Sequence, residues 1–147
     1  MKLISISKEK GAADILYRLL AERTPEESIS HKEMPSLDDH RTFVRSNPYQ
    51  CWYLIKVEED YVGCCYITKE RAIGISIFVA HRRLGYGRAA VRMLMEKWPG
   101  RFYANINPDN DKSHELFQSM GFTLLQLTFV KERQTWQETV AAHEEET

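Results

Sequence analysis

The sequence predicts a mixed α/β (α+β) fold in which a central, mostly antiparallel sheet is flanked by helices. Short runs with strand-like patterning alternate with segments whose apolar residues recur at helical spacing. Their order along the chain is β-α-α-β-β-β-α-β-α-β. The early strands adjoin as hairpins and the later ones are separated by helices, which predicts a mixed sheet covered by helices.

The first third of the chain predicts one strand and two helices. In residues 3–7, Ile4 and Ile6 alternate with serines, as in a strand. An amphipathic helix follows up to Arg23, and residues 24–35 read as a polar loop. Ser36 followed by Asp39 is a capping-box pattern, so a short helix begins there and ends before Pro48.

The middle of the chain predicts three strands and a long helix. The strand-like runs are residues 51–57, 61–68 and 72–79, and the first two are close enough to form a hairpin. A helix follows a glycine-rich turn and ends at Pro99-Gly100. Its apolar residues recur at helical spacing, so one face packs on the sheet.

The last third predicts a strand, a helix and a final strand. The strands are residues 101–106 and about 122–131. Between them, Asn107-Pro108 reads as a helix cap and first helical position, and Gly121 as the residue after the helix end. We expect one domain over residues 1–133 and a flexible C-terminal tail over residues 134–147.

Composition narrows the class of protein. With 147 residues, 43% hydrophobic and 28% charged, the chain reads as a single soluble globular domain. The net charge of -1 makes nucleic acid an unfavoured partner. No apolar stretch is long enough for a membrane span, and the N-terminus does not read as a signal peptide. Three cysteines without metal-type spacing predict reduced, buried thiols, no metal site and a cytoplasmic location.

The turn before the long helix carries an anion-binding pattern. It reads Arg82-Arg83-Leu84-Gly85-Tyr86-Gly87-Arg88, and it has no Ser, Thr, Asp or Asn to cap the helix. Glycines expose backbone N–H groups, and a helix N-terminus adds partial positive charge. Arginines add charge-assisted hydrogen bonds to phosphate. The turn therefore predicts a phosphate-bearing ligand.

Three anion-binding motifs compete for this turn. A P-loop requires Gly-Lys-Ser/Thr, which is missing. The spacing of Gly85, Gly87 and Ala90 satisfies a loose dinucleotide fingerprint, but that motif should follow the first strand of a longer βαβ series. An acyl-CoA turn, [Q/R]-x-x-G-x-[G/A], fits from Arg82 to Gly87.

A second motif lies further along the chain, and with both motifs the chain resembles the GNAT family of N-acetyltransferases over nearly its whole length. That block is NPDNDKSHELFQSMGF, residues 107–122, in which Asn110, Ser113, Phe117 and Gly121-Phe122 stand where the family has its typical residues. The resemblance implies acetyl-CoA as the cofactor. It places the diphosphate on the backbone of Arg83, Leu84, Gly85, Tyr86, Gly87 and Arg88, with Arg82 beside them. It places the pantetheine arm along Ile77, Phe78 and Val79, with an amide near Phe78 polarising the acetyl carbonyl, and Asn110, Ser113 and Phe117 on the far wall.

The catalytic acid and base are less defined. Many family members have a tyrosine where this chain has Phe117, and phenylalanine cannot donate a proton. Tyr103 and Tyr86 are alternative acids, and unassisted departure of the thiolate is another route. The third central strand carries no acid, so the candidate catalytic residues are His31, Glu33, Tyr103 and Asn105.

The resemblance implies direct acetyl transfer to a primary amine of a small molecule, with an amino sugar as one candidate. The alternatives are a protein amine, a modified nucleobase, or a non-catalytic module that only binds CoA. We expect a monomer or a homodimer.

Overall fold

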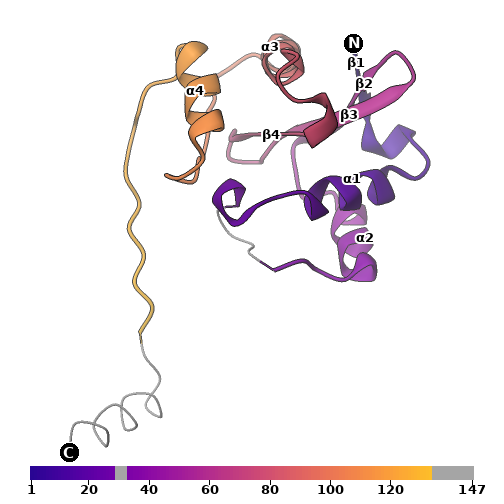
Figure 1. The fold of residues 1–147 in the computed structure, drawn as a ribbon, viewed down its shortest axis with the longest axis horizontal. Helices are drawn as coiled ribbons and strands as arrows, with labels where there is room; N and C mark the ends of the chain where they lie inside the picture. Colours follow the sequence, from indigo (N-terminus) through magenta and orange to yellow (C-terminus); the bar gives the residue numbers. More distant parts are fainter. Residues whose placement is uncertain (29–32, 134–147) are drawn as a thin grey trace, which may run out of the picture.

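A computed structural model describes residues 1–28 and 33–133, and its centre is an antiparallel sheet in the order β1-β2-β3-β4 (Figure 1). The strands are β1 (Lys2–Ser5), β2 (Cys51–Val57), β3 (Asp60–Ile67) and β4 (Ile73–Ile77). The helices are α1 (Ala12–Ala21), α2 (Leu37–Arg45), α3 (Tyr86–Lys97) and α4 (Asp111–Ser119). The predicted tail, residues 134–147, lies outside the described residues.

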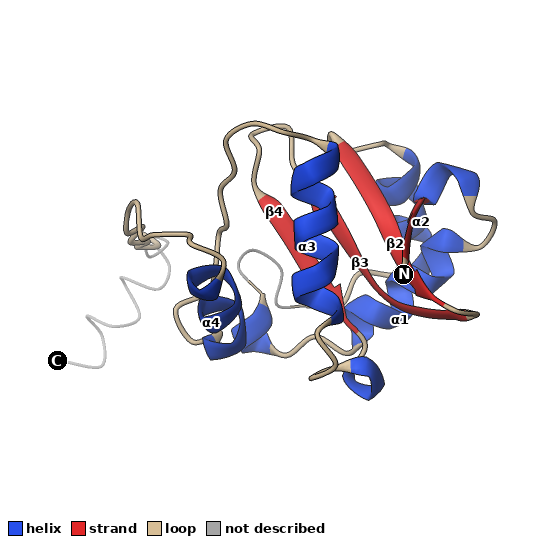
Figure 2. Ribbon diagram, turned by 90° about the horizontal axis from the view of Figure 1, so that it is seen from above, coloured by secondary structure: helices blue, strands red, loops and turns tan. Residues whose placement is uncertain are grey.

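The alternation of side chains along β2 divides the core into two layers. Tyr53 and Ile55 point to one face, in the cluster that includes Leu94 of α3. Leu54 points to the other face and packs in the cluster that includes Leu16 of α1. Figure 2 shows α3 lying across the sheet, and Figure 1 shows α1 and α2 on the opposite side. The mixed helix-and-sheet architecture predicted from the sequence is therefore confirmed.

Two local predictions also hold. Glu58 and Glu59 form the turn of the hairpin, because Val57 pairs with Asp60 across it. At the start of α2, the Ser36 hydroxyl accepts a hydrogen bond from the Asp39 backbone N–H at 3.1 Å. This bond satisfies a backbone donor of the first helical turn that the helix itself leaves free.

The strand predicted over residues 101–106 is wrong in extent. Only one residue of it, Tyr103, bridges the sheet, opposite Ala72 in parallel orientation. The Tyr103 N–H donates to Arg71 O at 3.0 Å, and the Ile73 N–H donates to Tyr103 O at 2.7 Å. Within the described chain this bridge is not continued into a ladder.

The strand predicted over residues 122–131 is also wrong for the described residues, since they assign no strand there. The predicted start of the following helix at Asn107-Pro108 is wrong by a few residues. Asn110 is the cap of α4, and its side chain accepts from the Ser113 N–H at 3.3 Å. Asn107 instead accepts from the Asp109 N–H at 2.9 Å, a local turn that competes with helix.

Arg71 holds the segment after α3 against the sheet. Its guanidinium donates to Trp98 O at 2.7 Å and to Arg101 O at 3.1 Å. The same group lies 4.5 Å from the centre of the Phe102 ring. These backbone carbonyls belong to a segment that forms no ladder of strand hydrogen bonds. The Arg71 side chain therefore supplies the donors that a neighbouring strand would otherwise supply.

We expect Arg71→Met to lower the free energy of unfolding by about 2 kcal/mol, because hydrogen bonds from a charged donor to two carbonyls are lost. Arg83→Met is the matched control, since both arginines have positive φ, 72° and 65°, and Arg83 is exposed. Urea unfolding followed by circular dichroism measures both. Equal stability of the two variants would contradict this role for Arg71.

Candidate cofactor and acetyl-transfer site

The turn between β4 and α3 exposes its backbone. β4 is followed by a 3-10 turn, Val79–His81, and α3 begins at Tyr86. Gly85 is the N-cap residue, with a left-handed φ of 80° and no side-chain cap hydrogen bond. A Cβ placed on Gly85 would meet no atom within 4 Å. Gly85 thus allows the left-handed backbone conformation, and the space above it is open.

The first turn of α3 presents N–H groups that the helix does not use. Ala89 N–H donates to Gly85 O at 3.1 Å, so the N–H groups before Ala89 precede the helical ladder. No acidic residue stands in this first turn. At Gly87, a Cβ would lie 3.7 Å from Ile77 and 3.8 Å from Ile75, so the helix start packs directly on β4. The helix dipole makes this end a favourable position for an anion.

The outer edge of β4 has unpaired backbone groups next to that helix start. Phe78 N–H donates to Val62 O at 2.9 Å, toward β3, and Ile73 N–H donates to Tyr103 O on the other side. Because N–H groups alternate between the two edges of a strand, those of Ile75 and Ile77 face away from β3. The amide available to a ligand near Phe78 is therefore that of Ile77, since the N–H of Phe78 is engaged.

The arginines of the turn do not all face the same way. Arg82 Nε donates to Ile77 O at 3.1 Å, and its guanidinium pairs with the Glu27 carboxylate at 3.3 Å. Arg88 donates to the Ser119 hydroxyl at 2.9 Å and to the Ser119 carbonyl oxygen at 3.2 Å. Arg83 is exposed. Two of the three predicted phosphate arginines are thus engaged within the protein, and the backbone amides carry most of the anion-binding potential.

The far wall predicted from the second block lies on α4. Asn110 and Ser113 are half-buried and bonded to each other at the helix start. Phe117 is 4% exposed and packs edge-to-face on Phe122, with ring centroids 5.1 Å apart. Its position in the core explains an aromatic residue there without any proton transfer. Contact of these three residues with a cofactor stays a prediction.

Comparisons with known proteins decide the family. The model of the "Acetyltransferase (GNAT) family" matches residues 13–122. The chain belongs to this family. The match includes the glycine turn, β4 and the whole of α4.

Solved structures agree with this fold. A chimeric spermidine N-acetyltransferase from Vibrio cholerae is 17% identical, with a TM-score of 0.66 over 84% of this chain and 82% of that one. An acetyltransferase from Thermus thermophilus is 22% identical, with a TM-score of 0.66 over 85% and 88%. A ribosomal L7/L12 α-N-protein acetyltransferase in complex with coenzyme A is 19% identical, with a TM-score of 0.69 over 84% and 80%. The comparison with curated proteins finds no match.

The predicted catalytic residues of this GNAT chain come from separate elements. His31 lies outside the described residues. Glu33 is exposed on the loop before α2. Tyr103 and Asn105 lie two residues apart on the segment that bridges β4, and Tyr103 is half-buried under the Arg101 guanidinium, 5.3 Å from its ring centre. Their catalytic roles stay predictions.

Two described histidines outside this set, His40 and His114, are packed against other parts of the chain. His40 is 6% exposed and lies against the Tyr17 ring, with centroids 5.4 Å apart; burial lowers the pKa of its imidazole. His114 is half-buried and its Nε2 atom is enclosed.

Sequence reasoning missed two residues that contact the β4 end, Glu22 and Glu27, and the bond that Asn107 makes. The Glu22 carboxylate accepts from the Val79 N–H at 2.9 Å, and Glu27 pairs with Arg82. Asn107 Nδ2 donates to Ser28 O at 2.8 Å. These bonds join residues 55 to 79 positions apart in the chain. Isolated polar residues carry no periodic signal, so the sequence did not single out Glu22 or Glu27, and it indicated Asn107 only as a helix cap.

The cysteines are core residues, as the sequence predicts. Cys51, Cys64 and Cys65 are free and buried. Burial raises the pKa of the Cys64 thiol to about 11 and also raises that of Cys51 and Cys65. A thiol with a raised pKa is a poor nucleophile at neutral pH, because the thiolate is the reactive form.

Within residues 1–28 and 33–133, no helix combines the length and the apolar character that crossing a membrane requires. Over the same residues, no group of three His, Cys, Asp or Glu side chains is placed to hold a metal ion.

We expect Glu27→Gln to lower the free energy of unfolding by about 1 kcal/mol, because it removes a partly buried ion pair. The side chains of Arg82 and Glu27 are 23% and 19% exposed, so solvent screens the pair only in part. Glu26→Gln is the matched control, since Glu26 is the exposed neighbour. Equal urea midpoints for the two variants would show that the Glu27–Arg82 ion pair does not stabilise the fold.

We expect the three thiols of the native chain to resist Ellman's reagent at pH 8 and to react after denaturation. The raised pKa of Cys64 also gives a pH dependence. Its folded value, about 11, lies above the ordinary 9.0, so the stability from its burial is complete below pH 9 and declines as pH rises toward 11. Cys64→Ala should flatten that decline in urea unfolding. Rapid labelling of a native thiol would argue against burial.

Proposed function

We propose that this GNAT chain transfers the acetyl group of acetyl-CoA directly to a primary amine of a small molecule. The observation that carries the proposal is the uncapped N-terminus of α3 beside the open edge of β4. One site offers N–H groups to an anion, and the adjoining edge offers peptide groups to an extended chain. Acetyl-CoA has both parts, a diphosphate and an amide-containing pantetheine arm.

The residues present fit this cofactor. Backbone N–H groups from Arg83 to Arg88 would hold the diphosphate, in the open space over Gly85. Ile75 and Ile77 would pair with the pantetheine amides, as an added strand does. Val79 has its N–H bound to Glu22, so it would contact the arm through its exposed side chain. When bound, acetyl-CoA supplies an acetyl group activated as a thioester.

Backbone chemistry also supports the transfer step. The Ile77 N–H would donate to the acetyl carbonyl oxygen, where negative charge develops during attack by an amine. Arg82 Nε donates a hydrogen bond to the Ile77 carbonyl oxygen and so orients that peptide. A thiol with a pKa of about 8.5, by analogy with cysteine, leaves readily as a thiolate. Tyr103 and Tyr86 remain the proposed acids if the leaving group takes a proton.

We assign removal of the amine proton to residues of the loop before α2 and of the segment after α3. An ammonium group must lose a proton before attack, and a base with a pKa near the working pH does this best. We retain His31, Glu33, Tyr103 and Asn105 as the proposed residues around the acceptor, with His31 and Glu33 as bases. No cysteine of the described core is suited to carry the acetyl group, which favours direct transfer.

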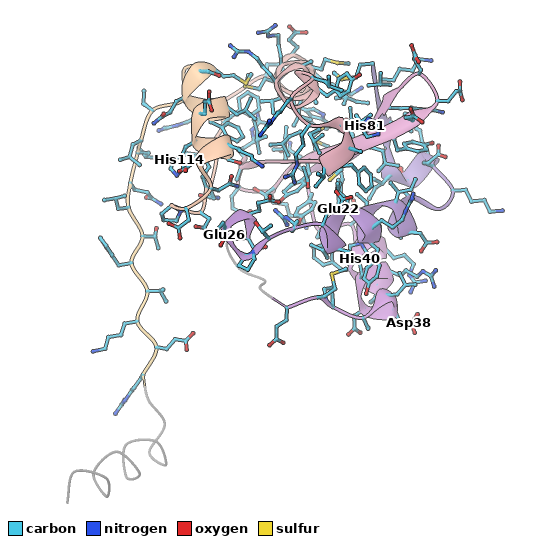
Figure 3. The ribbon with its side chains drawn as sticks, viewed as in Figure 1. Glu22, Glu26, Asp38, His40, His81 and His114 are labelled. Carbon is cyan, nitrogen blue, oxygen red and sulfur yellow. The ribbon has the colours of Figure 1, made fainter. Side chains whose placement is uncertain are left out.

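The acceptor is proposed to be a small cationic amine because the Glu22 carboxylate lies against this end of β4 and two further carboxylates follow it in the sequence. Glu22 contacts Val79 directly, and Glu26 follows on the next turn (Figure 3). Glu33 lies further along the same loop. Carboxylates raise the local concentration of a cationic substrate by long-range attraction. An amino sugar and a polyamine both meet this description, and so does a protein N-terminus.

We expect acetyl-CoA to raise the melting temperature of the chain and NAD to leave it unchanged, because only the former matches both halves of the site. Release of free thiol should then follow with at least one of an amino sugar, a polyamine and an N-terminal peptide. Turnover only with the peptide would move the acceptor class to protein amines. Binding without turnover on any amine would leave a CoA-binding module, and no shift with any CoA species would defeat the proposal.

We expect Gly87→Asp to weaken binding of coenzyme A at least tenfold, about 1.4 kcal/mol, because it brings a negative charge to the diphosphate. A Cβ at Gly87 would lie 3.7 Å from Ile77 and 3.8 Å from Ile75, so we expect a side chain there to lower the melting temperature somewhat in both this variant and its control. Gly87→Asn is the control, with the same shape and no charge, and isothermal titration measures both. Equal affinities of the two variants would place the diphosphate elsewhere.

A further inference from the structure

An aromatic cluster lies on the α1 side of the sheet. It consists of Tyr49, Trp52 and Tyr66, with Phe43 of α2 at its border. The Tyr49 and Tyr66 rings are stacked in parallel, with centroids 4.1 Å apart and an interplanar angle of 5°. Trp52 meets both rings edge-on, at centroid distances of 4.8 and 6.0 Å. These side chains lie outside the residues that form the cofactor site.

Gly74 allows the Tyr66 ring to lie across β4. The two residues are directly opposite each other in the sheet. A Cβ on Gly74 would overlap the Tyr66 ring, and the nearest ring atom would be Cζ, which carries the hydroxyl. Neighbouring strands are about 4.8 Å apart, so a tyrosine ring that reaches Gly74 carries its hydroxyl beyond the backbone of β4. The Tyr66 hydroxyl therefore extends toward the outer edge of the sheet.

The hydroxyl reaches this edge where regular pairing stops. The last bond across the edge joins the Ile73 N–H to Tyr103 O, and Gly74 is the next residue. The later outward N–H groups of β4 have no partner among the described residues. One of them, that of Ile77, is the amide proposed to polarise the acetyl carbonyl. The Tyr66 hydroxyl thus stands beside the approach to the proposed transfer site.

The face of β4 that Tyr66 covers is turned toward α1 and α2. The three isoleucines of β4 pack in the layer of α3, whereas Phe78 packs in the layer of α1. Because side chains alternate along a strand, Gly74 and Ser76 share the face of Phe78. Figure 1 shows the described part of the loop before α2, which is proposed to supply the base, on the same side. An acceptor on this face would meet two neutral hydroxyl groups, those of Tyr66 and Ser76.

The tyrosine hydroxyls of the cluster are donors rather than bases. Burial raises the pKa of Tyr49 and of Tyr66 above the ordinary value of 10.0, and the nearby Arg23 guanidinium offsets the rise only in part. Both hydroxyls therefore keep their protons at neutral pH and can donate to a neutral oxygen. The positive charge of Arg23 also disfavours a second ammonium group at this place. A monoamine that carries hydroxyl groups fits these side chains better than a polyamine does.

We propose that Tyr66 selects the acceptor: its hydroxyl binds a hydroxyl group of the amine substrate, and Tyr49 and Gly74 hold the ring in position. The substrate class is an amine with hydroxyl groups on the same small framework, as in an amino sugar. This inference rests on the acetyl-transfer function proposed above. A site built to bond a substrate hydroxyl rejects an analogue without it, because the polar group of the site is then left unpaired.

Acetylation of two ring-shaped amines tests the proposal. Glucosamine carries hydroxyl groups, and cyclohexylamine has a ring of the same size without them. We expect the wild-type chain to prefer glucosamine, and we expect Tyr66→Phe to lower kcat/KM for glucosamine by about tenfold or more while leaving the value for cyclohexylamine unchanged. Tyr61→Phe is the matched control, because it removes a hydroxyl near the other end of the same strand. It should leave both values unchanged.

Isothermal titration with coenzyme A shows whether Tyr66→Phe keeps its fold and cofactor site, and we expect unchanged affinity. Weaker coenzyme A binding, equal losses on both amines, or no loss on either would overturn the selection by Tyr66. A wild-type chain that acetylates spermidine or an N-terminal peptide but neither ring amine would also overturn it, while the acetyl-transfer function would stand. If no amine releases thiol from acetyl-CoA, the proposed function itself fails, and this inference fails with it.

Discussion

The single bridge between Ala72 and Tyr103 determines the shape of the site. At this bridge the chain after α3 meets the sheet beside Ala72, immediately before β4, and among the described residues the pairing goes no further than the bond from the Ile73 N–H to Tyr103 O. If the ladder continued, the N–H groups of Ile75 and Ile77 would be consumed by a neighbouring strand. Because it stops, the N–H groups of Ile75 and Ile77 on the outer edge of β4 have no partner among the described residues, immediately before the turn into α3.

Two arginines hold this divergence in place from opposite ends. Arg71 binds the carbonyls of Trp98 and Arg101, and so fixes where the later segment meets the sheet. Arg82 binds the carbonyl of Ile77 and the Glu27 carboxylate, and so fixes where β4 ends. Charged donors to backbone carbonyls are stronger than neutral ones, which suits positions where regular pairing is interrupted. The open edge is thus a maintained feature rather than a loosely ordered one.

The features that sequence patterns predicted are those that local physics dictates. The hairpin, the Ser36 cap, the two-layer core and the glycine turn each depend on neighbours within a few residues or on periodic burial. The segments 101–106 and 122–131 have strand-like patterns, but pairing requires a partner in space, and pattern alone cannot supply one. The bonds of Glu22, Glu27 and Asn107 join distant parts of the chain, and isolated polar residues leave no periodic trace.

The same distinction explains why one half of the site is so much better defined than the other. The cofactor half is made of backbone groups: an uncapped helix start, a left-handed glycine and a strand edge. Such an arrangement of backbone groups requires particular residues, above all Gly85 and Gly87, and these glycines can be recognised from the sequence alone. The acceptor half is made of side chains from separate loops, where a carboxylate or an imidazole serves equally well in many arrangements. β4 itself carries no acid, so the proton chemistry falls to those loops, and the acceptor must be found by experiment.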